Sequence, residues 1–373
     1  MTDFRPVPFG DAHGASHAAP HTHPAHANPS EKRVALCPHL SLEHYRGGEK
    51  WTATLANRLA ADGVNVAVHA LPYAPGNTRR VAVRDVLDAA VPYREAWRHD
   101  LSAYDTAYVF YAPLSELFFT GASRAIAGIH SWVYVSPRLF ESHYGLVPTV
   151  VKALYRTIGA TDLRRYAAVH TVTPAFRSPH ANTVYIPNFV DTDRFSPGRA
   201  PLDDEFTVLV TAARIREKGW DTVRAVARRL PANVRLLATG TGSDPYVTDL
   251  GFLTEGELAD AYARAHVVLH AARVDTDSMV INEACASGTP VVTTSLPTHD
   301  VENEAVLHRD TPDEMLGAIA MLYDEWERGD GYDERCRVAR REGETHGFDV
   351  VYPQLKRLLL GESVPASRPE VVG

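Results

Sequence analysis

The chain has 373 residues, 45% of them hydrophobic, which is enough for two ordinary domains that each bury a core. Its formal net charge is −8, but residues 1–198 carry 19 basic against 16 acidic side chains, whereas residues 199–373 carry 19 against 30. The sequence has no dense basic patch interleaved with aromatic residues, no long apolar run and no signal peptide, so we expect a cytoplasmic protein that does not bind nucleic acid.

Residues 1–30 are rich in His, Ala and Pro and contain too few large apolar residues to form a core. We therefore expect a disordered tail. Its histidines could hold a transition metal weakly, but a Pro-rich disordered chain does not preorganise ligands, so we predict no metal site there. The three cysteines are far apart in the sequence and are expected to be reduced packing residues: Cys37, Cys285 and Cys336.

Residues 31–190 alternate short apolar segments with helical patterns, which is typical of a Rossmann-like domain with a parallel sheet. The first helix is expected over 50–63, because its apolar residues recur at helical spacing and Gly63 is a normal C-terminal signal. The expected strands of this domain are 34–40, 64–71, 106–111, 125–130, 167–173 and 183–187.

Residues 191–205 are polar and rich in Pro and Asp, and we interpret them as a linker. The alternation then restarts and predicts a second Rossmann-like domain over 206–345, followed by a helix over 346–361 that could cross back to the first domain and a tail over 362–373. The expected strands of the second domain are 206–213, 233–240, 246–252, 266–272 and 290–294. The predicted fold class is α/β with two doubly wound parallel sheets.

Two segments combine glycine or positive charge with the end of an expected strand. Gly47 and Gly48 precede a helix, where free amides attract an anion, although a glycine turn that merely starts a helix would look the same. Arg214, Arg216 and Lys218 form a basic loop whose guanidinium forks and point charge suit a diphosphate. An ordinary exposed basic loop is about as consistent with these residues.

A third segment, VDTDSMVINEACASGTPVV over 274–292, is the most specific of the three. Acidic residues precede a helix there, and the first amides of the helix would open toward a phosphate, while carboxylates could accept hydrogen bonds from hydroxyls. Acidic residues near a helix start are also ordinary caps. The residues with expected binding roles in this segment are Asp275, Asp277, Ser278, Met279, Val280 and Glu283.

These segments together resemble the retaining glycosyltransferases of family 4 (glycosyl transferases group 1), which are two-domain enzymes with the GT-B fold. Asp275 and Glu283 lie eight positions apart, like two acidic residues of that family's donor-binding signature. RGGEK resembles the family's glycine loop, AIAGIHSW its strand ending in an active-site His, and RIREKGWD its basic loop. IPNFVDTDRFSP and LGFLTEGELADAYARAHVVLHAA also match in order, so the resemblance spans about Arg33 to Gly361.

The resemblance implies two domains facing each other across a cleft and transfer of a hexose-type sugar from a nucleotide-diphosphate sugar, with retention of anomeric configuration and no metal cofactor. Glu283 would hold the ribose and Asp275 the hydroxyls of the donor sugar. Lys218 and Arg214 would hold the diphosphate, and His130 would hydrogen-bond the transferred sugar. The phosphates would also face Gly48 and the amides of Met279 and Val280.

The chain departs from the family pattern at three points. The family usually has Glu where this chain has Asp275 and Gly where it has Ser278, and its basic pair is commonly five positions apart rather than four, so that Arg216 could share the role of Arg214. Two alternatives therefore stay open, a nucleotide-sugar epimerase with the same fold and a non-catalytic protein that binds nucleotide sugars.

The sequence does not identify the acceptor. The slight positive charge of residues 1–198 is consistent with an anionic or lipid-linked acceptor and with peripheral contact at the inner membrane face. An expected helix near 147–166 carries basic side chains that could rest on a membrane, although an ordinary solvated helix face is the commoner explanation. These side chains are Lys152, Arg156, Arg164 and Arg165.

Overall fold

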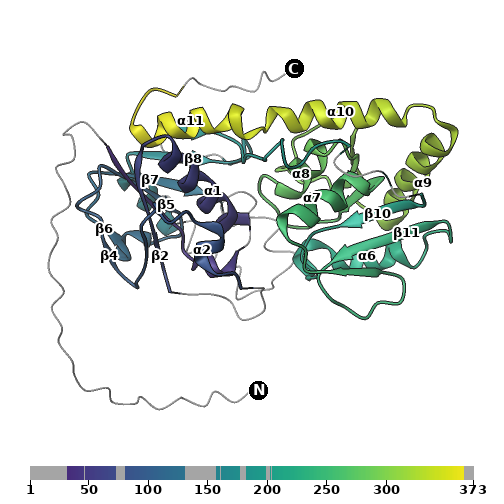
Figure 1. Cartoon of the computed structure of the whole chain (residues 1–373), viewed down its shortest axis with the longest axis horizontal. Helices are drawn as coiled ribbons and strands as arrows, with labels where there is room; N and C mark the ends of the chain where they lie inside the picture. Colours follow the sequence, from purple (N-terminus) through teal and green to yellow (C-terminus); the bar gives the residue numbers. More distant parts are fainter. Residues whose placement is uncertain are drawn as a thin grey trace, which may run out of the picture. The chain divides into compact units, whose positions relative to one another are not determined.

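The computed structural model describes residues 32–45, 47–72, 80–130, 157–159, 161–176, 182–198, 202 and 204–364. Lys32–Gly373 forms one compact unit, and both large sheets belong to it (Figure 1). The tail predicted over 1–30 lies outside the described residues, as do Lys152 and Arg156 of the expected basic helix. None of the helices in the described ranges is both long and apolar enough to cross a membrane.

The first sheet has seven parallel strands in the order β3-β2-β1-β5-β7-β8-β9. Its strands are β1 (Arg33–Cys37), β2 (Asn65–Ala70), β3 (Tyr93–Glu95), β5 (Thr106–Phe110), β7 (Arg124–Ile129), β8 (Ala168–Thr171) and β9 (Thr183–Tyr185). The other elements among the described residues of this part are α1 (Gly47–Ala61), α2 (Val83–Val86), three short 3-10 helices, η1 (Leu42–His44), η2 (Ser115–Leu117) and η3 (Leu163–Arg165), and a small pair of strands, β4 (His99–Asp100) and β6 (Phe119–Thr120).

Both faces of the first sheet are buried. Val34 and Leu36 of β1 belong to one core cluster and Ala35 and Cys37 to another, because successive side chains of a strand point to opposite faces. The first cluster includes apolar residues of α1 and of the last helix, α11 (Phe348–Leu360). A parallel sheet covered on both faces needs such continuous apolar strands, which is why the sequence shows short apolar runs there.

The second sheet has six parallel strands in the order β12-β11-β10-β13-β14-β15. Its strands are β10 (Phe206–Val210), β11 (Val234–Thr239), β12 (Thr248–Gly251), β13 (Val267–His270), β14 (Val291–Thr293) and β15 (Val306–His308). The helices of this part are η4 (Arg216–Lys218), α6 (Trp220–Ala227), α7 (Glu255–Arg264), α8 (Met279–Ala286), α9 (Pro312–Arg328) and α10 (Tyr332–Thr345). The two predicted parallel sheets are thus both present.

The last helix is tied to the first sheet by polar contacts as well as by its apolar face. Tyr352 and Lys356 both bind the carboxylate of Asp62, at 2.7 Å and 2.6 Å. Arg124, the first residue of β7, donates a hydrogen bond to the carbonyl of Leu358 at 2.8 Å. The last described helix, α11, therefore packs against the first sheet and not the second (Figure 1).

Helix α10 was not predicted, because its sequence YDERCRVARREGET is almost entirely polar and hides the usual apolar period. It is positioned by a close backbone contact instead. A Cβ added to Gly343 would lie 2.2 Å from the backbone nitrogen of Ala286, at the end of α8. The absence of a side chain at this position lets α10 approach α8, the helix that carries much of the predicted site.

We expect Gly343→Ala to lower the free energy of unfolding by about 2–3 kcal/mol, because an extra methyl group has no room between the two helices. Urea denaturation followed by circular dichroism measures this change. Gly317→Ala is the matched control, since Gly317 also lies inside a helix but a Cβ there has nothing within 4 Å. An equal loss of stability in the two variants would contradict the packing explanation.

Candidate active site

The predicted site residues lie where strands of the two parallel sheets end. Lys218 belongs to the short helix η4 that follows β10, and Asp275 lies in the loop between β13 and α8. His130 directly follows β7 of the first sheet. In open α/β sheets, ligands bind beyond the carboxyl ends of the strands, so these positions are suited to a binding site.

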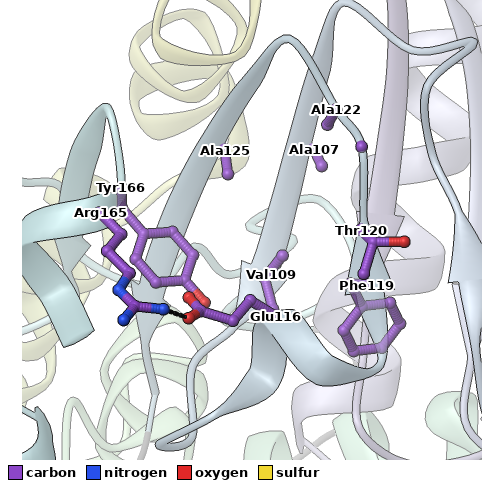
Figure 2. Close-up of a pocket in the computed structure, with 10 residues that line it drawn as sticks. Ala107, Val109, Glu116, Phe119, Thr120, Ala122, Ala125, Arg165 and Tyr166 are labelled. Atoms are coloured by element: carbon purple, nitrogen blue, oxygen red, sulfur yellow. Dashed lines mark hydrogen bonds and ion pairs between the residues drawn. The ribbon is translucent and has the colours of Figure 1, made fainter.

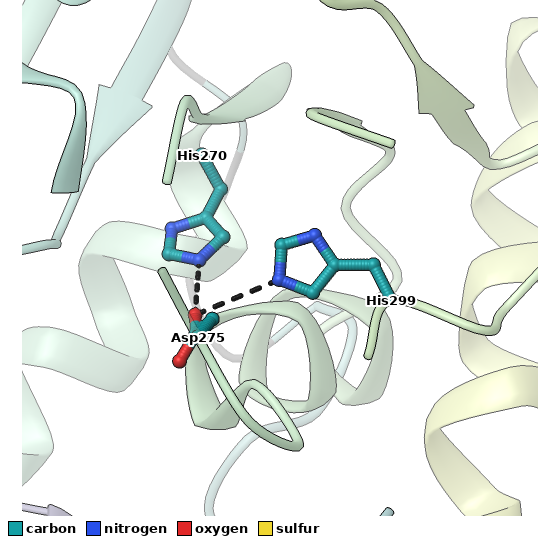
Figure 3. Close-up of side chains that lie close together, drawn as sticks. All are labelled: His270, Asp275 and His299. Carbon is teal, nitrogen blue, oxygen red and sulfur yellow. Dashed lines mark hydrogen bonds and ion pairs between the residues drawn. The ribbon is translucent and has the colours of Figure 1, made fainter. Parts of the chain in front are cut away.

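Lys218 and Asp275 form an ion pair, with Nζ 3.0 Å from Oδ1. The other carboxylate oxygen, Oδ2, lies 2.6 Å from Nε2 of His270 and 3.6 Å from Nε2 of His299 (Figure 3). Burial alone would raise the pKa of Asp275, but the charge of Lys218 and the hydrogen bond from His270 outweigh it and hold this pKa well below its usual value. Asp275 is therefore an ionised carboxylate that can accept hydrogen bonds from sugar hydroxyls.

Helix α8 begins directly after this carboxylate. Ser278 is its N-cap and accepts a hydrogen bond from the backbone of Ile281, while Met279 and Val280 are its first residues. A Cβ added to Gly47, the first residue of α1, would lie 3.9 Å from Cγ of Met279. The predicted glycine loop and the predicted phosphate-binding helix start are therefore neighbours, and both present helix N-termini, which favour anions.

Lys50 was not singled out in the sequence, yet it contacts Glu283. Its Nζ lies 2.8 Å from Oε1 of Glu283 and 2.6 Å from Oε2 of Glu255. Burial raises the pKa of Glu283 although Lys50 opposes that shift. The pKa of Lys50 is itself raised, because its two carboxylate partners outweigh its burial. In the sequence, Lys50 is visible only as a charged residue at the start of the apolar pattern of α1, which does not indicate its partners.

Arg214 is oriented toward β11 and β12 rather than toward Asp275. It donates to the carbonyl of Thr239 at 3.0 Å and pairs with Asp249 at 2.5 Å. Its Nη1 atom is buried and makes no hydrogen bond within the described part of the chain. Arg216 is exposed. Of the three predicted basic residues, the structure thus brings only Lys218 into direct contact with Asp275.

Asp277 joins the helix start to the segment that connects the two sheets. Its carboxylate accepts hydrogen bonds from the backbone nitrogen of Asn188 and from the side chain of Asn282. Its backbone carbonyl accepts another from the Asn188 side chain at 3.0 Å. Burial raises the pKa of Asp277 to about 6. These contacts give Asp277 a structural role, and its donor-binding role stays a prediction.

His130 is held by aromatic neighbours. Its Nε2 lies 2.8 Å from the hydroxyl of Tyr108, and its ring stacks on Phe110 with 4.3 Å between centroids. The Tyr108 hydroxyl also contacts His170 at 2.5 Å. Burial holds the pKa of His130 well below its usual value, so the ring is neutral at pH 7. Such a ring is fixed in orientation, as a residue that orients a substrate must be, and its contact with a sugar stays a prediction.

A cavity of about 280 Å³ lies elsewhere in the first part of the chain (Figure 2). Its apolar floor includes Ala107 and Ala125, which lie near the amino ends of β5 and β7. Glu116 and Arg165 form an ion pair at its side. Because His130 lies at the opposite, carboxyl end of β7, this cavity is not part of the predicted site.

Residues 204–325 match the family model described as glycosyl transferases group 1. This range contains Lys218, Asp275 and Glu283. The chain is also 28% identical over 217 residues to a GDP-mannose-dependent α-(1-6)-phosphatidylinositol monomannoside mannosyltransferase of Mycobacterium tuberculosis. The match covers 48% of this chain and 54% of that protein, so the chain spans about half the length of the curated relatives it matches.

Solved structures with a similar fold cover most of both chains. Sucrose-phosphate synthase from Thermosynechococcus elongatus superposes with a TM-score of 0.67 at 17% identity, over 88% of this chain and 99% of that one. Anabaena Alr3699/HepE in complex with UDP-glucose has a TM-score of 0.65 at 16% identity, over 88% of this chain and 99% of that one. WaaG, a glycosyltransferase involved in lipopolysaccharide biosynthesis, has a TM-score of 0.63 at 14% identity, over 88% of this chain and 100% of that one. At these identities the likeness shows the fold, and the predicted GT-B class is confirmed.

Proposed function

We propose that this protein is a glycosyltransferase that moves a hexose-type sugar from a nucleotide-diphosphate sugar to an acceptor. The observation that carries the proposal is the Lys218–Asp275 ion pair directly before the N-terminus of α8. This arrangement places a cation, an ionised hydrogen-bond acceptor and a helix N-terminus together, within the range that matches glycosyl transferases group 1. A diphosphate joined to a sugar needs each of these groups.

The reaction breaks the bond between the anomeric carbon and the leaving phosphate, so negative charge grows on the diphosphate. Lys218 and the free amides of Met279 and Val280 would stabilise that charge, and donors of this kind are each worth roughly 2–4 kcal/mol of barrier. Arg214 would add a further cation by turning from Asp249 toward the diphosphate. Asp275 would bind hydroxyls of the donor sugar, and Glu283 would bind the ribose while sharing its carboxylate with Lys50.

We further propose that the reaction retains the anomeric configuration, with the leaving phosphate helping to deprotonate the acceptor on the same face. The resemblance of the 274–292 segment supports this proposal. GDP-mannose is the first donor to test, because the matched Mycobacterium tuberculosis protein is GDP-mannose-dependent, and UDP-glucose is the second, because Alr3699/HepE binds it. The reaction as proposed requires no metal cofactor, since the cationic and amide donors face the leaving group.

For the acceptor we propose a lipid-linked or otherwise anionic molecule reached by peripheral contact with a membrane. Two observations support this. The name of the mycobacterial relative specifies a phosphatidylinositol monomannoside, and residues 1–198 of this chain carry 19 basic against 16 acidic side chains. Sedimentation with vesicles containing phosphatidylinositol, compared with phosphatidylcholine alone, tests the membrane contact directly.

The donor site is tested by thermal unfolding of the full chain with GDP, GDP-mannose, UDP and UDP-glucose. A ligand at about 100 times its dissociation constant should stabilise the protein by roughly 2.7 kcal/mol, and we expect one nucleotide and its sugar derivative to do so. No stabilisation by any of the four would contradict the proposed function. Conversion of the bound nucleotide sugar to an epimer without acceptor would instead identify an epimerase.

A further inference from the structure

Two buried histidines converge on the carboxylate of Asp275 from separate parts of the second sheet. His270 is the last residue of β13, and His299 lies in the loop after β14. Their side chains are 1% and 0% exposed, and that of Asp275 is 12% exposed. Both rings point at the same oxygen, Oδ2, while Oδ1 binds Lys218 (Figure 3). Neither histidine was a predicted site residue.

The hydrogen bonds fix which nitrogen of His270 carries the proton. Nε2 lies 2.6 Å from Oδ2 of Asp275, and an ionised carboxylate can only accept. Nε2 must therefore donate, and Nδ1 is the bare nitrogen, which is consistent with its having no hydrogen-bond partner among the described residues. Burial lowers the pKa of His270 to about 4, so this neutral tautomer persists at pH 7.

The same reasoning gives the opposite tautomer for His299. Its Nδ1 lies 3.1 Å from the carbonyl oxygen of Thr294, which only accepts. Nδ1 also lies 3.1 Å from the hydroxyl of Thr293, and that hydroxyl already donates its proton to the carbonyl of His270. Nδ1 of His299 must therefore carry the proton. Nε2 lies 3.6 Å from Oδ2 of Asp275, too far for a hydrogen bond, and has no hydrogen-bond partner among the described residues.

A metal ion held by these three residues is the competing explanation, because His270, Asp275 and His299 are common ligand types placed close together. Two distances argue against it. Ligands of one tetrahedral metal with bonds of about 2.0 Å lie roughly 3.3 Å apart, whereas His270 and Asp275 are 2.6 Å apart, a hydrogen-bond distance. The ammonium of Lys218 lies 3.0 Å from the same carboxylate and would repel a metal cation.

We propose that His270 and His299 are positioning residues that set the orientation of the Asp275 carboxylate for the donor sugar. His270 fixes Oδ2 by a hydrogen bond, which leaves the Oδ1 edge, where Lys218 and the backbone nitrogen of Thr276 also donate, to sugar hydroxyls. The buried ring of His299 limits the movement of Oδ2, since its Nε2 lies 3.6 Å away. This inference rests on the proposed function, in which Asp275 contacts the sugar and not the nucleotide.

The test is calorimetric titration of the full chain with GDP and GDP-mannose, or with UDP and UDP-glucose if that pair stabilises the wild type. In His270→Leu we expect about tenfold weaker binding of the nucleotide sugar with unchanged binding of the nucleotide. His270→Gln is the conservative control, because its amide can place an N–H near the Nε2 position, and it should recover most of the loss. His299→Asn keeps a donor near the Nδ1 position but removes the ring atoms that face Oδ2, so it should also weaken binding of the nucleotide sugar while leaving binding of the nucleotide unchanged.

The outcomes separate this inference from the proposed function. If the wild type binds no nucleotide, the proposed function fails and this inference fails with it. If the wild type binds the nucleotide sugar but the folded variants bind it equally well, or lose nucleotide and sugar binding together, the positioning role alone is overturned. Stoichiometric metal in the wild type, with binding lost on chelation, would overturn it in favour of the metal site. If His270→Leu does not fold, His299→Asn still decides through the ratio of its affinities for the nucleotide sugar and the nucleotide.

Discussion

Lys218→Ala is expected to lower kcat/KM for the nucleotide sugar at least about 100-fold, because Lys218 is the cation paired with Asp275, where we propose that the donor binds. The same substitution removes the partner that keeps Asp275 ionised despite its burial. Both the charge on the leaving group and the acceptor for the sugar would therefore be affected. Nucleotide release from the donor that stabilises the wild type measures the rate, and thermal unfolding with the same ligand measures binding.

Arg229→Ala is the matched control for this substitution. Arg229 lies just after α6, the helix between β10 and β11. It also pairs with a carboxylate, that of Asp313, but its side chain is 55% exposed. A surface pair of this kind contributes about 0–1 kcal/mol to stability and should leave turnover unchanged. If both variants retained wild-type kcat/KM, Lys218 would have no part in the reaction and the main support for the proposed donor site would be lost.

The parallel sheets were predictable because their strands are buried on both faces. Segments such as Phe206–Val210 are buried throughout and apolar apart from Thr207, and helices with an apolar period separate them, so the alternation is visible without any long-range information. Helix α10 was not predictable from periodicity. It is fixed by the contact of Gly343 with Ala286, a relation between positions far apart in the chain that no local pattern contains.

The candidate site was predictable in part, because several of its residues follow strands that are neighbours in one sheet. Asp275 and the start of α8 lie in one continuous segment, and Lys218 follows the neighbouring strand β10, so the order of strands brings them together. Lys50, His270 and His299 were missed. Lys50 and His299 reach their carboxylates from other segments of the chain. His270 precedes Asp275 in the same segment, but its role is visible only from the carboxylate oxygen that its ring faces.

Lys50→Met is expected to lower the free energy of unfolding by about 3 kcal/mol at pH 7, because it leaves the buried Glu283 and the neighbouring Glu255 without their shared cation. Lys356→Met is the control, since Lys356 also lies 2.6 Å from a carboxylate, Asp62, but in a more exposed pair that should contribute about 0–1 kcal/mol. Urea denaturation of the two variants gives the comparison.

The loss in Lys50→Met should depend on pH in a defined direction. The pKa of Glu283 is already raised by burial, and removing Lys50 should raise it further. A carboxyl whose pKa is higher in the folded than in the unfolded protein favours folding when protonated, and that stability is lost as pH rises through the folded pKa. The deficit should therefore be largest at neutral pH and shrink as the solution is acidified toward the ordinary pKa of glutamate. Adding Glu283→Gln to Lys50→Met removes the buried carboxylate that has lost its cation, whereas Glu255 keeps its ion pair with Arg194, and should recover part of the stability at pH 7. A deficit independent of pH and unchanged in the double variant would show that Lys50 acts through packing and not through its charge.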